Sequence, residues 1–269
     1  MKKKILALAL AAVLVVTGLT ACGSKNDAKT DNGKVYRTVD EIKKSGTIKI
    51  GVFSDKNPFG YVDEKGEYQG YDIYFAKRIA KDLGVKLEFV STEAANRVEY
   101  LKTGKVDITL ANFTVTDERA ESVDFALPYM KVALGVVSPD KALIKSVDDL
   151  KGKKLIVAKG TTAEAYFEKN YPDVQLVKFD QYTETYNALL DGRGDAMSTV
   201  LAWALKNKGF SVGVQSIGET QTIAPAVSKG NSSLLKWLND ETKALAKEKF
   251  FHKDYKETLE PVYGDKVNP

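Results

Sequence analysis

The chain has 269 residues, with 40 basic and 36 acidic side chains, one cysteine and one histidine. Without the three lysines at positions 2–4, the numbers of basic and acidic side chains are nearly equal. This balance argues against a surface that binds nucleic acid. One cysteine cannot form an internal disulfide, and His252 alone cannot build a His/Cys metal cluster, so we expect no metal and no cofactor.

The chain begins with the pattern of a secretory signal. Three lysines precede the apolar run 5–16, which is too short to span a bilayer. The run leads into Leu19-Thr20-Ala21-Cys22, which resembles the bacterial lipobox. The resemblance implies a lipoprotein signal peptide over 1–21 and lipidation (palmitate) at Cys22, with anchoring at the extracytoplasmic face of the bacterial cell membrane. An ordinary signal with a chance cysteine is the alternative, disfavoured because the single cysteine stands where the motif needs it.

Strand-like and helix-like stretches alternate after a polar segment. Residues 22–36 are predicted to be a disordered tether, since 23–34 lack large apolar side chains. The pattern then predicts a strand at 48–52, an amphipathic helix at 72–83, a strand at 86–90, a helical turn at 98–103 and a strand at 107–111. Helices between buried strands indicate an α/β fold with parallel pairing.

Two junctions of this pattern occur twice, in the same order. Residues 38–43 lead through a glycine into a strand, and residues 146–151 do the same; each begins with a hydroxyl residue three positions before an acid. In each of the segments 101–108 and 190–196, a predicted helix ends at a glycine and a strand follows. Helix–turn–strand junctions are often alike in unrelated proteins. The recurrence of two kinds of junction in the same order nevertheless favours two similar α/β lobes.

Two long extended stretches, 129–137 and 222–227, are predicted to cross between these lobes. Lobe 1 would then hold residues 37–134 plus 225–269, and lobe 2 would hold residues 135–224. Two crossing strands form a hinge, because a few residues absorb the change in backbone angles. The hinge would leave a cleft open on one side.

The chain from Val39 to Asp265 resembles the polar amino acid family of periplasmic binding proteins that serve ABC importers. Its motifs, weak alone and specific in order, are Pro58-Phe59-Gly60-Tyr61, Gly70-Tyr71-Asp72-Ile73, residues 104–108, residues 113–119, Val123-Asp124-Phe125, Pro128-Tyr129 and Gly160-Thr161-Thr162. The resemblance implies a type II periplasmic-binding-protein fold and a monomeric, non-enzymatic carrier that delivers its ligand to an ABC permease and its ATPase. Segments 93–97 and 111–114 most resemble members that bind cysteine or cystine, then aspartate or glutamate.

An amino acid enclosed in a cleft loses water from both charges, which is costly unless each is paired. A carboxylate is well met by a guanidinium, hydroxyls and helix N-terminal amides. The resemblance assigns the α-carboxylate to Arg119, with the Thr114 hydroxyl beside it and the Asn112 carbonyl on the ammonium side; Phe113 lies within the same segment. A surface ion pair of Arg119 with Asp117 or Glu121 is the alternative, and the Thr-x-Thr-x-x-Arg context favours binding.

Further candidates come from both lobes. Thr161 and Thr162 precede the helical stretch 163–169, whose free N–H groups can hold the carboxylate from the other side, or simply cap the helix. The resemblance places Asp55 at the α-amino group. Phe59 covers apolar ligand atoms or belongs to the core. Arg97 either faces the pocket and selects a negative side chain, or is solvated.

One segment departs from the family pattern. Members usually follow the Gly-Asp-Ala strand of lobe 2 with an aspartate for the ligand ammonium, and residues 196–203 contain no acid. Without this aspartate the ligand ammonium loses a charge-assisted hydrogen bond that contributes about 1.5–3 kcal/mol. Three alternatives follow: Asp180 or Ser198 takes the place of the aspartate, the protein binds its ligand weakly, or the ligand has a different cationic end. The alternative function is an enzyme like the cyclohexadienyl dehydratases, whose general acid would be Asp180 or Glu184.

Overall fold

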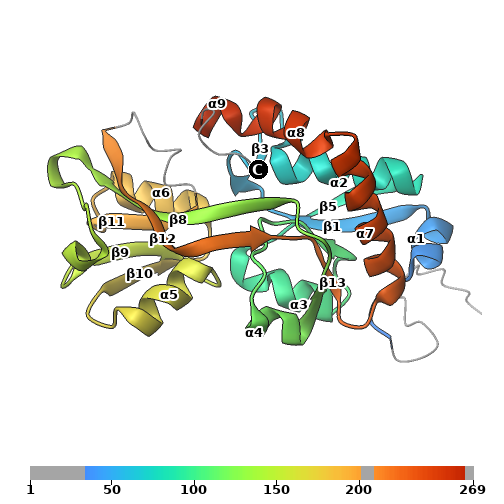
Figure 1. Cartoon of the computed structure of the whole chain (residues 1–269), viewed down its shortest axis with the longest axis horizontal. Helices are drawn as coiled ribbons and strands as arrows, with labels where there is room; N and C mark the ends of the chain where they lie inside the picture. Colours follow the sequence, from blue (N-terminus) through green and yellow to red (C-terminus); the bar gives the residue numbers. More distant parts are fainter. Residues whose placement is uncertain (1–33, 201–208, 264–269) are drawn as a thin grey trace, which may run out of the picture.

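The computed structural model describes residues 34–200 and 209–263. The predicted signal peptide 1–21, Cys22 and the tether up to residue 33 lie outside this range. Two five-stranded sheets form two lobes, joined by long strands that run through the middle of the molecule (Figure 1). The expected two-lobed α/β fold is confirmed.

The sheet of lobe 1 combines an early and a late part of the chain. Its order is β5 (Lys86–Ser91), β1 (Thr47–Val52), β6 (Ile108–Thr109), β13 (Ala226–Ser228), β7 (Val123–Phe125). Strand β1 is parallel to β5 and β6, and β13 is antiparallel to β6 and β7. Its helices are α1 (Val39–Ser45), α2 (Tyr71–Leu83), α3 (Arg97–Lys102), α4 (Asp117–Ser122), α7 (Ser232–Lys247), α8 (Phe250–Thr258) and α9 (Glu260–Tyr263).

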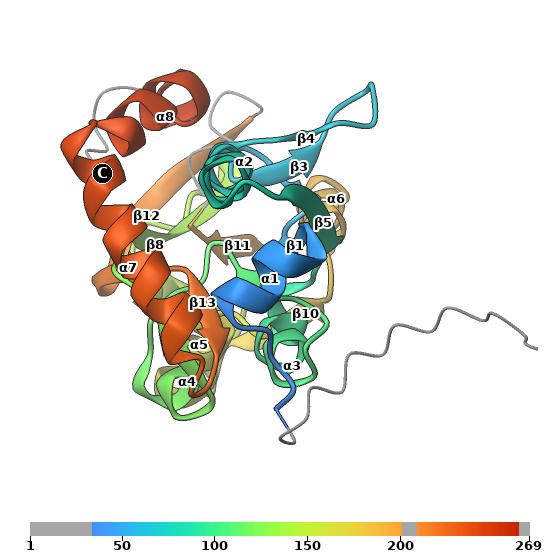
Figure 2. The same ribbon diagram turned by 90° about the vertical axis from the view of Figure 1, so that its right-hand side faces the viewer.

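The sheet of lobe 2 comes from the middle of the chain. Its order is β10 (Gln175–Phe179), β9 (Lys154–Ala158), β11 (Ala196–Thr199), β8 (Met130–Pro139), β12 (Phe210–Ile223). Helices α5 (Thr162–Asn170) and α6 (Tyr182–Leu190) connect its parallel strands. Separate apolar clusters, around Phe167 and around Met197, hold these helices to the sheet. A third, small sheet of β2 (Asp55–Lys56), β3 (Gly60–Val62) and β4 (Tyr68–Gln69) belongs to lobe 1, and its β3–β4 hairpin projects beyond α2 (Figure 2).

Both predicted capping boxes are present. The Thr38 hydroxyl accepts from the Glu41 amide, and the Glu41 carboxylate accepts from the Thr38 amide at 2.6 Å. Ser146 and Asp149 repeat this arrangement at a 3-10 turn, residues 147–150. Each box satisfies amides that a helix start leaves without partners.

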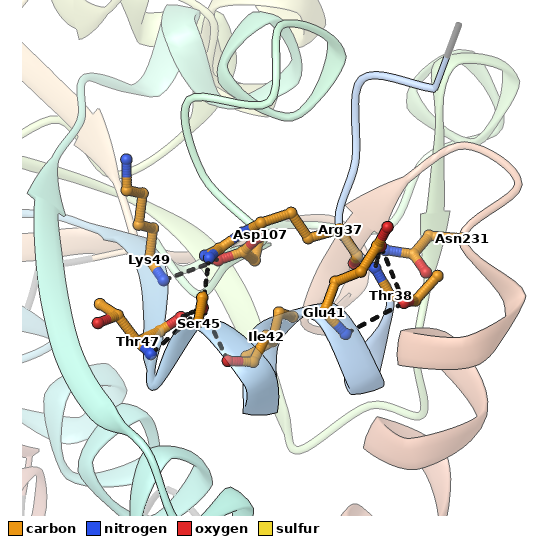
Figure 3. A network of polar contacts seen from close by, with 9 residues as sticks. All are labelled: Arg37, Thr38, Glu41, Ile42, Ser45, Thr47, Lys49, Asp107 and Asn231. Carbon is orange, nitrogen blue, oxygen red and sulfur yellow. Dashed lines mark hydrogen bonds and ion pairs between the residues drawn. The ribbon is translucent and has the colours of Figure 1, made fainter. Parts of the chain in front are cut away.

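An aspartate at the same place in each lobe accounts for the second repeated junction. Asp107 accepts from the Lys49 amide at 2.8 Å, and Asp195 accepts from the Lys154 amide at 2.7 Å. Only the lobe 1 aspartate also pairs with Arg37, which ties the N-terminal segment to the sheet (Figure 3). The two lobes therefore share one contact, an aspartate that accepts from the amide of a neighbouring strand. We call this contact the aspartate clamp; in lobe 1 it also includes Arg37.

The crossing stretches are β8 and β12, which pair antiparallel along their length, from Phe210 opposite Pro139 to Ile223 opposite Met130. The predicted strand 222–227 is divided, because β12 ends at Ile223 and β13 begins at Ala226. Pro225 lies in the break and has no N–H to donate to a ladder. The lobe boundaries at 135 and 225 stay a prediction.

Two further details differ from expectation. The predicted strand 107–111 is shorter, since β6 ends at Thr109 and the chain then turns into Asn112 with φ +43°. Residues assigned to the end of the tether contact lobe 1, because the Tyr36 hydroxyl donates to the Gly230 carbonyl at 3.0 Å. The short β6 matters for function, because its turn leads directly into the cleft.

Candidate ligand-binding cleft

A cleft lies between the lobes at the carboxyl ends of β1, β6, β9 and β11, where α/β folds commonly bind ligands. Lobe 1 contributes polar lining residues, which are Lys56, Arg97, Asn112 and Thr114. Across from them lie residues 158, 161–163, 182 and 198–200, and Leu134 comes from the crossing strand β8. The cleft is therefore built from segments distant in sequence.

Arg97 points inward at the start of α3 and is only 3% exposed. Its guanidinium donates to the carbonyls of Ala94 (2.9 Å), Ala111 (3.1 Å) and Asn112 (3.1 Å), and across the lobes to Gly160 (2.9 Å). Burial, and then the neighbouring guanidinium, lower the pKa of Arg97 to about 9. The solvated alternative for Arg97 is thus wrong; its selective role stays a proposal.

Arg119 reaches the same place from α4. Thr116 caps this helix, accepting from the Arg119 amide at 3.2 Å. The guanidinium lies 5.0 Å from the ring of Phe113 and donates to the carbonyls of Thr114 (2.7 Å) and Gly160 (2.9 Å). Burial lowers the pKa of Arg119 to about 10.

Two guanidiniums of lobe 1 therefore share one carbonyl of lobe 2, that of Gly160. Phe113 lies beneath both, with its ring centre 4.6 Å from the Arg97 guanidinium carbon. The ion pairs of the described residues do not join Arg119 to Asp117 or Glu121. Both guanidiniums reach the opposite lobe, and Arg97 also lines the cleft.

Helix α5 presents its N-terminus to these cations. Thr161 caps it, accepting from the Glu164 amide at 3.2 Å while its hydroxyl donates to Ala158 at 2.7 Å. The amides of Thr162 and Ala163, in the first turn, have no acceptor within the helix. The hydroxyls of Thr162 and Thr114 donate to the same Gln221 oxygen of β12, at 2.7 and 3.3 Å. Thr114 and Thr162 thus meet at the crossing strand.

Lys56 is the functional candidate that the sequence reading missed. It is 2% exposed, and its ammonium donates to Asn112 Oδ1 (2.8 Å) and the Tyr182 hydroxyl (3.1 Å). Its Nζ also lies 4.4 Å from the centre of the Tyr182 ring. Burial first, then Arg97, lower the pKa of Lys56 well below its ordinary value. Lysine side chains are usually exposed to solvent. The one sequence signal for a buried Lys56 is its position between Asp55 and the Pro58-Phe59 motif.

Asn112 connects Lys56 to the body of lobe 1. Its amide N–H donates to Asp72 at 2.8 Å, and its side-chain nitrogen Nδ2 is buried without a partner. Asp72 also accepts from the Tyr129 hydroxyl at 2.6 Å, and burial raises the pKa of Asp72 to about 7. Asp72 thereby fixes the strained Asn112 backbone from behind the cleft.

The remaining predicted residues lie elsewhere. Asp55 accepts from the amides of Tyr182 (2.7 Å) and Thr183 (3.2 Å) at the N-terminus of α6, so it joins the lobes. Phe59 is 2% exposed in the core of lobe 1, as its core alternative expected. Asp180 pairs with Lys159 at 3.0 Å and lines a separate hollow near Asp55. Neither Asp55 nor Asp180 lines the cleft.

The described residues contain no group of three or more His, Cys, Asp or Glu side chains placed to hold a metal ion. None of the helices described is long and apolar enough to span a membrane.

Two lobes joined by two crossing strands around a polar cleft define a solute-binding protein. The family described as bacterial extracellular solute-binding proteins, family 3, matches residues 48–259, and the chain belongs to it. The ABC transporter glutamine-binding protein GlnH of Bacillus subtilis (strain 168) is 33% identical over 270 residues, which cover 96% of this chain and 97% of that protein.

Two solved structures are more similar. The solute receptor for L-cysteine of Neisseria gonorrhoeae is 56% identical, with a TM-score of 0.84, covering 87% of this chain and 98% of that one. The cysteine-binding protein from Campylobacter jejuni is 54% identical, with a TM-score of 0.83, covering 86% and 96%. The expected family and fold are confirmed.

Proposed function

We propose that this chain captures a small polar amino acid between its lobes, cysteine or cystine first and aspartate or glutamate second, for an ABC importer. The observation that carries the proposal is the convergence of Arg97 and Arg119 on the N-terminus of α5. A guanidinium pair facing helix amides matches a carboxylate from two sides. Similarity to two cysteine-binding structures supports cysteine as the first choice.

Closure of the two lobes couples binding to transport. A ligand favours the closed state only through contacts that it makes there and not in the open state. In this structure Arg97 and Arg119 bind the lobe 2 carbonyl directly, and Asp55 binds the α6 amides. These direct bonds between the lobes belong to the closed state, and a ligand bound between the lobes would add its own contacts to them.

Isothermal titration of the protein with the twenty amino acids and cystine tests this function. Binding to cysteine, cystine, aspartate or glutamate is expected, with Arg119→Ala weakening it at least tenfold, because a charge-assisted hydrogen bond contributes about 1.5–3 kcal/mol. Arg193→Ala is the control, since Arg193 lies over the Phe179 ring and is not among the residues that line the cleft. Unchanged affinity in Arg119→Ala would remove the site assignment.

The attachment to the membrane is part of the proposal. A diacylglycerol on Cys22 would hold the protein at the extracytoplasmic face of the cell membrane, and residues 23–33 would let a monomer reach the permease and its ATPase. Palmitate labelling in bacterial cells is expected for the wild type and lost in Cys22→Ala. A labelled variant protein would contradict the anchor.

The protein is proposed to act by binding alone. The dehydratase alternative needs a general acid in the cleft, yet Asp180 and Glu184, its two candidates, do not line the cleft. Incubation with prephenate or arogenate is expected to give no product above the uncatalysed rate. A rate that Arg119→Ala abolishes would establish the enzyme instead.

A further inference from the structure

The charged residues that line the cleft are all cations. Lys56 and Arg97 line it directly, and Arg119 lies behind them, sharing the Gly160 carbonyl with Arg97. Lys56 is 2% exposed and Arg97 is 3% exposed. None of the described lining residues is an aspartate or a glutamate. A buried positive charge of this kind is costly unless an anion accompanies it.

The nearest carboxylates are each used elsewhere. Asp55 accepts from two amides of α6, and Asp72 accepts from the Asn112 amide and the Tyr129 hydroxyl behind the cleft. Glu164 accepts from the Gly160 amide and pairs with Lys178 at 3.0 Å. Among the described residues that line the cleft, an ammonium would therefore meet no free carboxylate.

The stretch after β11 supplies no acid either. Residues 196–208 read Ala-Met-Ser-Thr-Val-Leu-Ala-Trp-Ala-Leu-Lys-Asn-Lys, without aspartate or glutamate. Among them Ser198, Thr199 and Val200 line the cleft, and Ser198 already donates to the Gly135 carbonyl at 3.1 Å. The lobe 2 wall therefore offers a ligand hydroxyls and amides rather than a negative charge.

Unused hydrogen-bond capacity also points to an anion. Asn112 Nδ2 is buried without a partner, and a side-chain amide nitrogen only donates. The first-turn amides of Thr162 and Ala163 are donors too. Ammonium groups are donors as well, so they cannot satisfy these groups, whereas a carboxylate or another oxygen-bearing anion can.

We propose that the cleft recognises its ligand through the negative end alone, and that a small thiol-bearing or similar carboxylate without an amine binds at least as well as the corresponding amino acid. Lys56 acts as a specificity residue, because its ammonium would repel the α-ammonium of a zwitterion and attract a second negative or polar group. This inference rests on the proposed function, since it concerns the same site.

Three small molecules separate the two ends of the ligand. L-cysteine carries both charges, 3-mercaptopropionate lacks the amine, and cysteamine lacks the carboxylate. In isothermal titration of the protein we expect 3-mercaptopropionate to bind within threefold of L-cysteine or more tightly, and cysteamine not to bind. A site that pairs the ammonium would instead lose far more than tenfold on removal of the amine.

Three variants test the charges themselves. Lys56→Met is expected to weaken 3-mercaptopropionate at least tenfold and L-cysteine less, so that their ratio reverses. Thr199→Asp places a carboxylate on the lobe 2 wall, and it is expected to strengthen L-cysteine and weaken 3-mercaptopropionate at least tenfold. Thr199→Asn, of the same shape without the charge, is expected to change the ratio less than threefold.

The outcomes are distinguishable. If L-cysteine binds and 3-mercaptopropionate binds more than threefold more weakly, this inference is wrong and the proposed function stands. If neither compound nor any amino acid binds, the proposed function fails and the inference falls with it. If Lys56→Met does not fold, judged by its circular dichroism, the Thr199 pair and the three wild-type titrations still decide.

Discussion

Substitution of Gly160 by alanine should block closure of the lobes. Gly160 has φ +71°, and a Cβ built on it would lie 2.4 Å from Ala95 Cα and 2.6 Å from Ala95 N. Those atoms are backbone of the other lobe, so no side-chain rotation can relieve the overlap. The lobes would have to part by about 1 Å to restore ordinary van der Waals contact, at roughly 3.5 Å between carbons.

That separation acts on the two bonds from Arg97 and Arg119 to the Gly160 carbonyl, each 2.9 Å. Hydrogen bonds from charged donors contribute about 1.5–3 kcal/mol each, so losing both removes at least about 3 kcal/mol from the closed state. With 1.4 kcal/mol per tenfold, we expect ligand affinity to fall about 100-fold or more.

The control is Gly192→Ala. Gly192 has φ +69°, and a Cβ there would have no atom within 4 Å. Both variants carry the left-handed strain of about 1–2 kcal/mol, so both should lower the melting temperature of the ligand-free protein. Only Gly160→Ala should weaken binding in isothermal titration. Wild-type affinity in Gly160→Ala, or equal losses in both variants, would refute the closure geometry.

Three further predictions concern the cations, a buried acid and the aspartate clamp. Arg97→Met should weaken binding about tenfold or more by titration, since it removes buried donors; unchanged affinity would place Arg97 outside the site. Burial raises the pKa of Asp254 to about 9, so the native state holds an extra proton between about pH 4 and pH 9 and loses stability as pH rises through that window, by up to about 1.4 kcal/mol per pH unit. Asp254→Asn should therefore raise the melting temperature at pH 8 and change it little at pH 4; an equal shift at both would contradict the assignment. Asp107→Asn should lower the free energy of unfolding in urea by about 2 kcal/mol, because it breaks a partly buried ion pair. Its exposed counterpart Asp195→Asn should lower it by under about 1 kcal/mol; equal losses would refute the difference between the lobes.

The sequence predicted the features that depend on local signals. The capping boxes at Thr38 and Ser146, the strand at 48–52 and the long extended stretch at 129–137 are present almost as expected. Hydroxyl–acid spacing, glycine after a helix and apolar runs act over a few residues, so they can be read without the fold.

The cleft needed more than local signals. The Thr-x-Thr-x-x-Arg context predicted a binding role for Arg119, which stays a prediction. Lys56 was missed, because nothing near it in sequence shows that Tyr182, 126 residues away, encloses it. Asp55 was expected at a ligand amine, and the structure instead sets it against the α6 amides of the other lobe. Whether a charged side chain is buried depends on which groups of the opposite lobe cover it or bind it.

The sequence by itself therefore determined two α/β lobes, the first of their crossing strands and one of the two cations that line the cleft, Arg97. Only the tertiary structure decided which charges share the cleft and which acids are already occupied, as with Asp55 and Asp72. The physical reason is distance: periodicity and capping act within a few residues, whereas desolvation and ion pairing depend on side chains that meet only when both lobes have formed and closed.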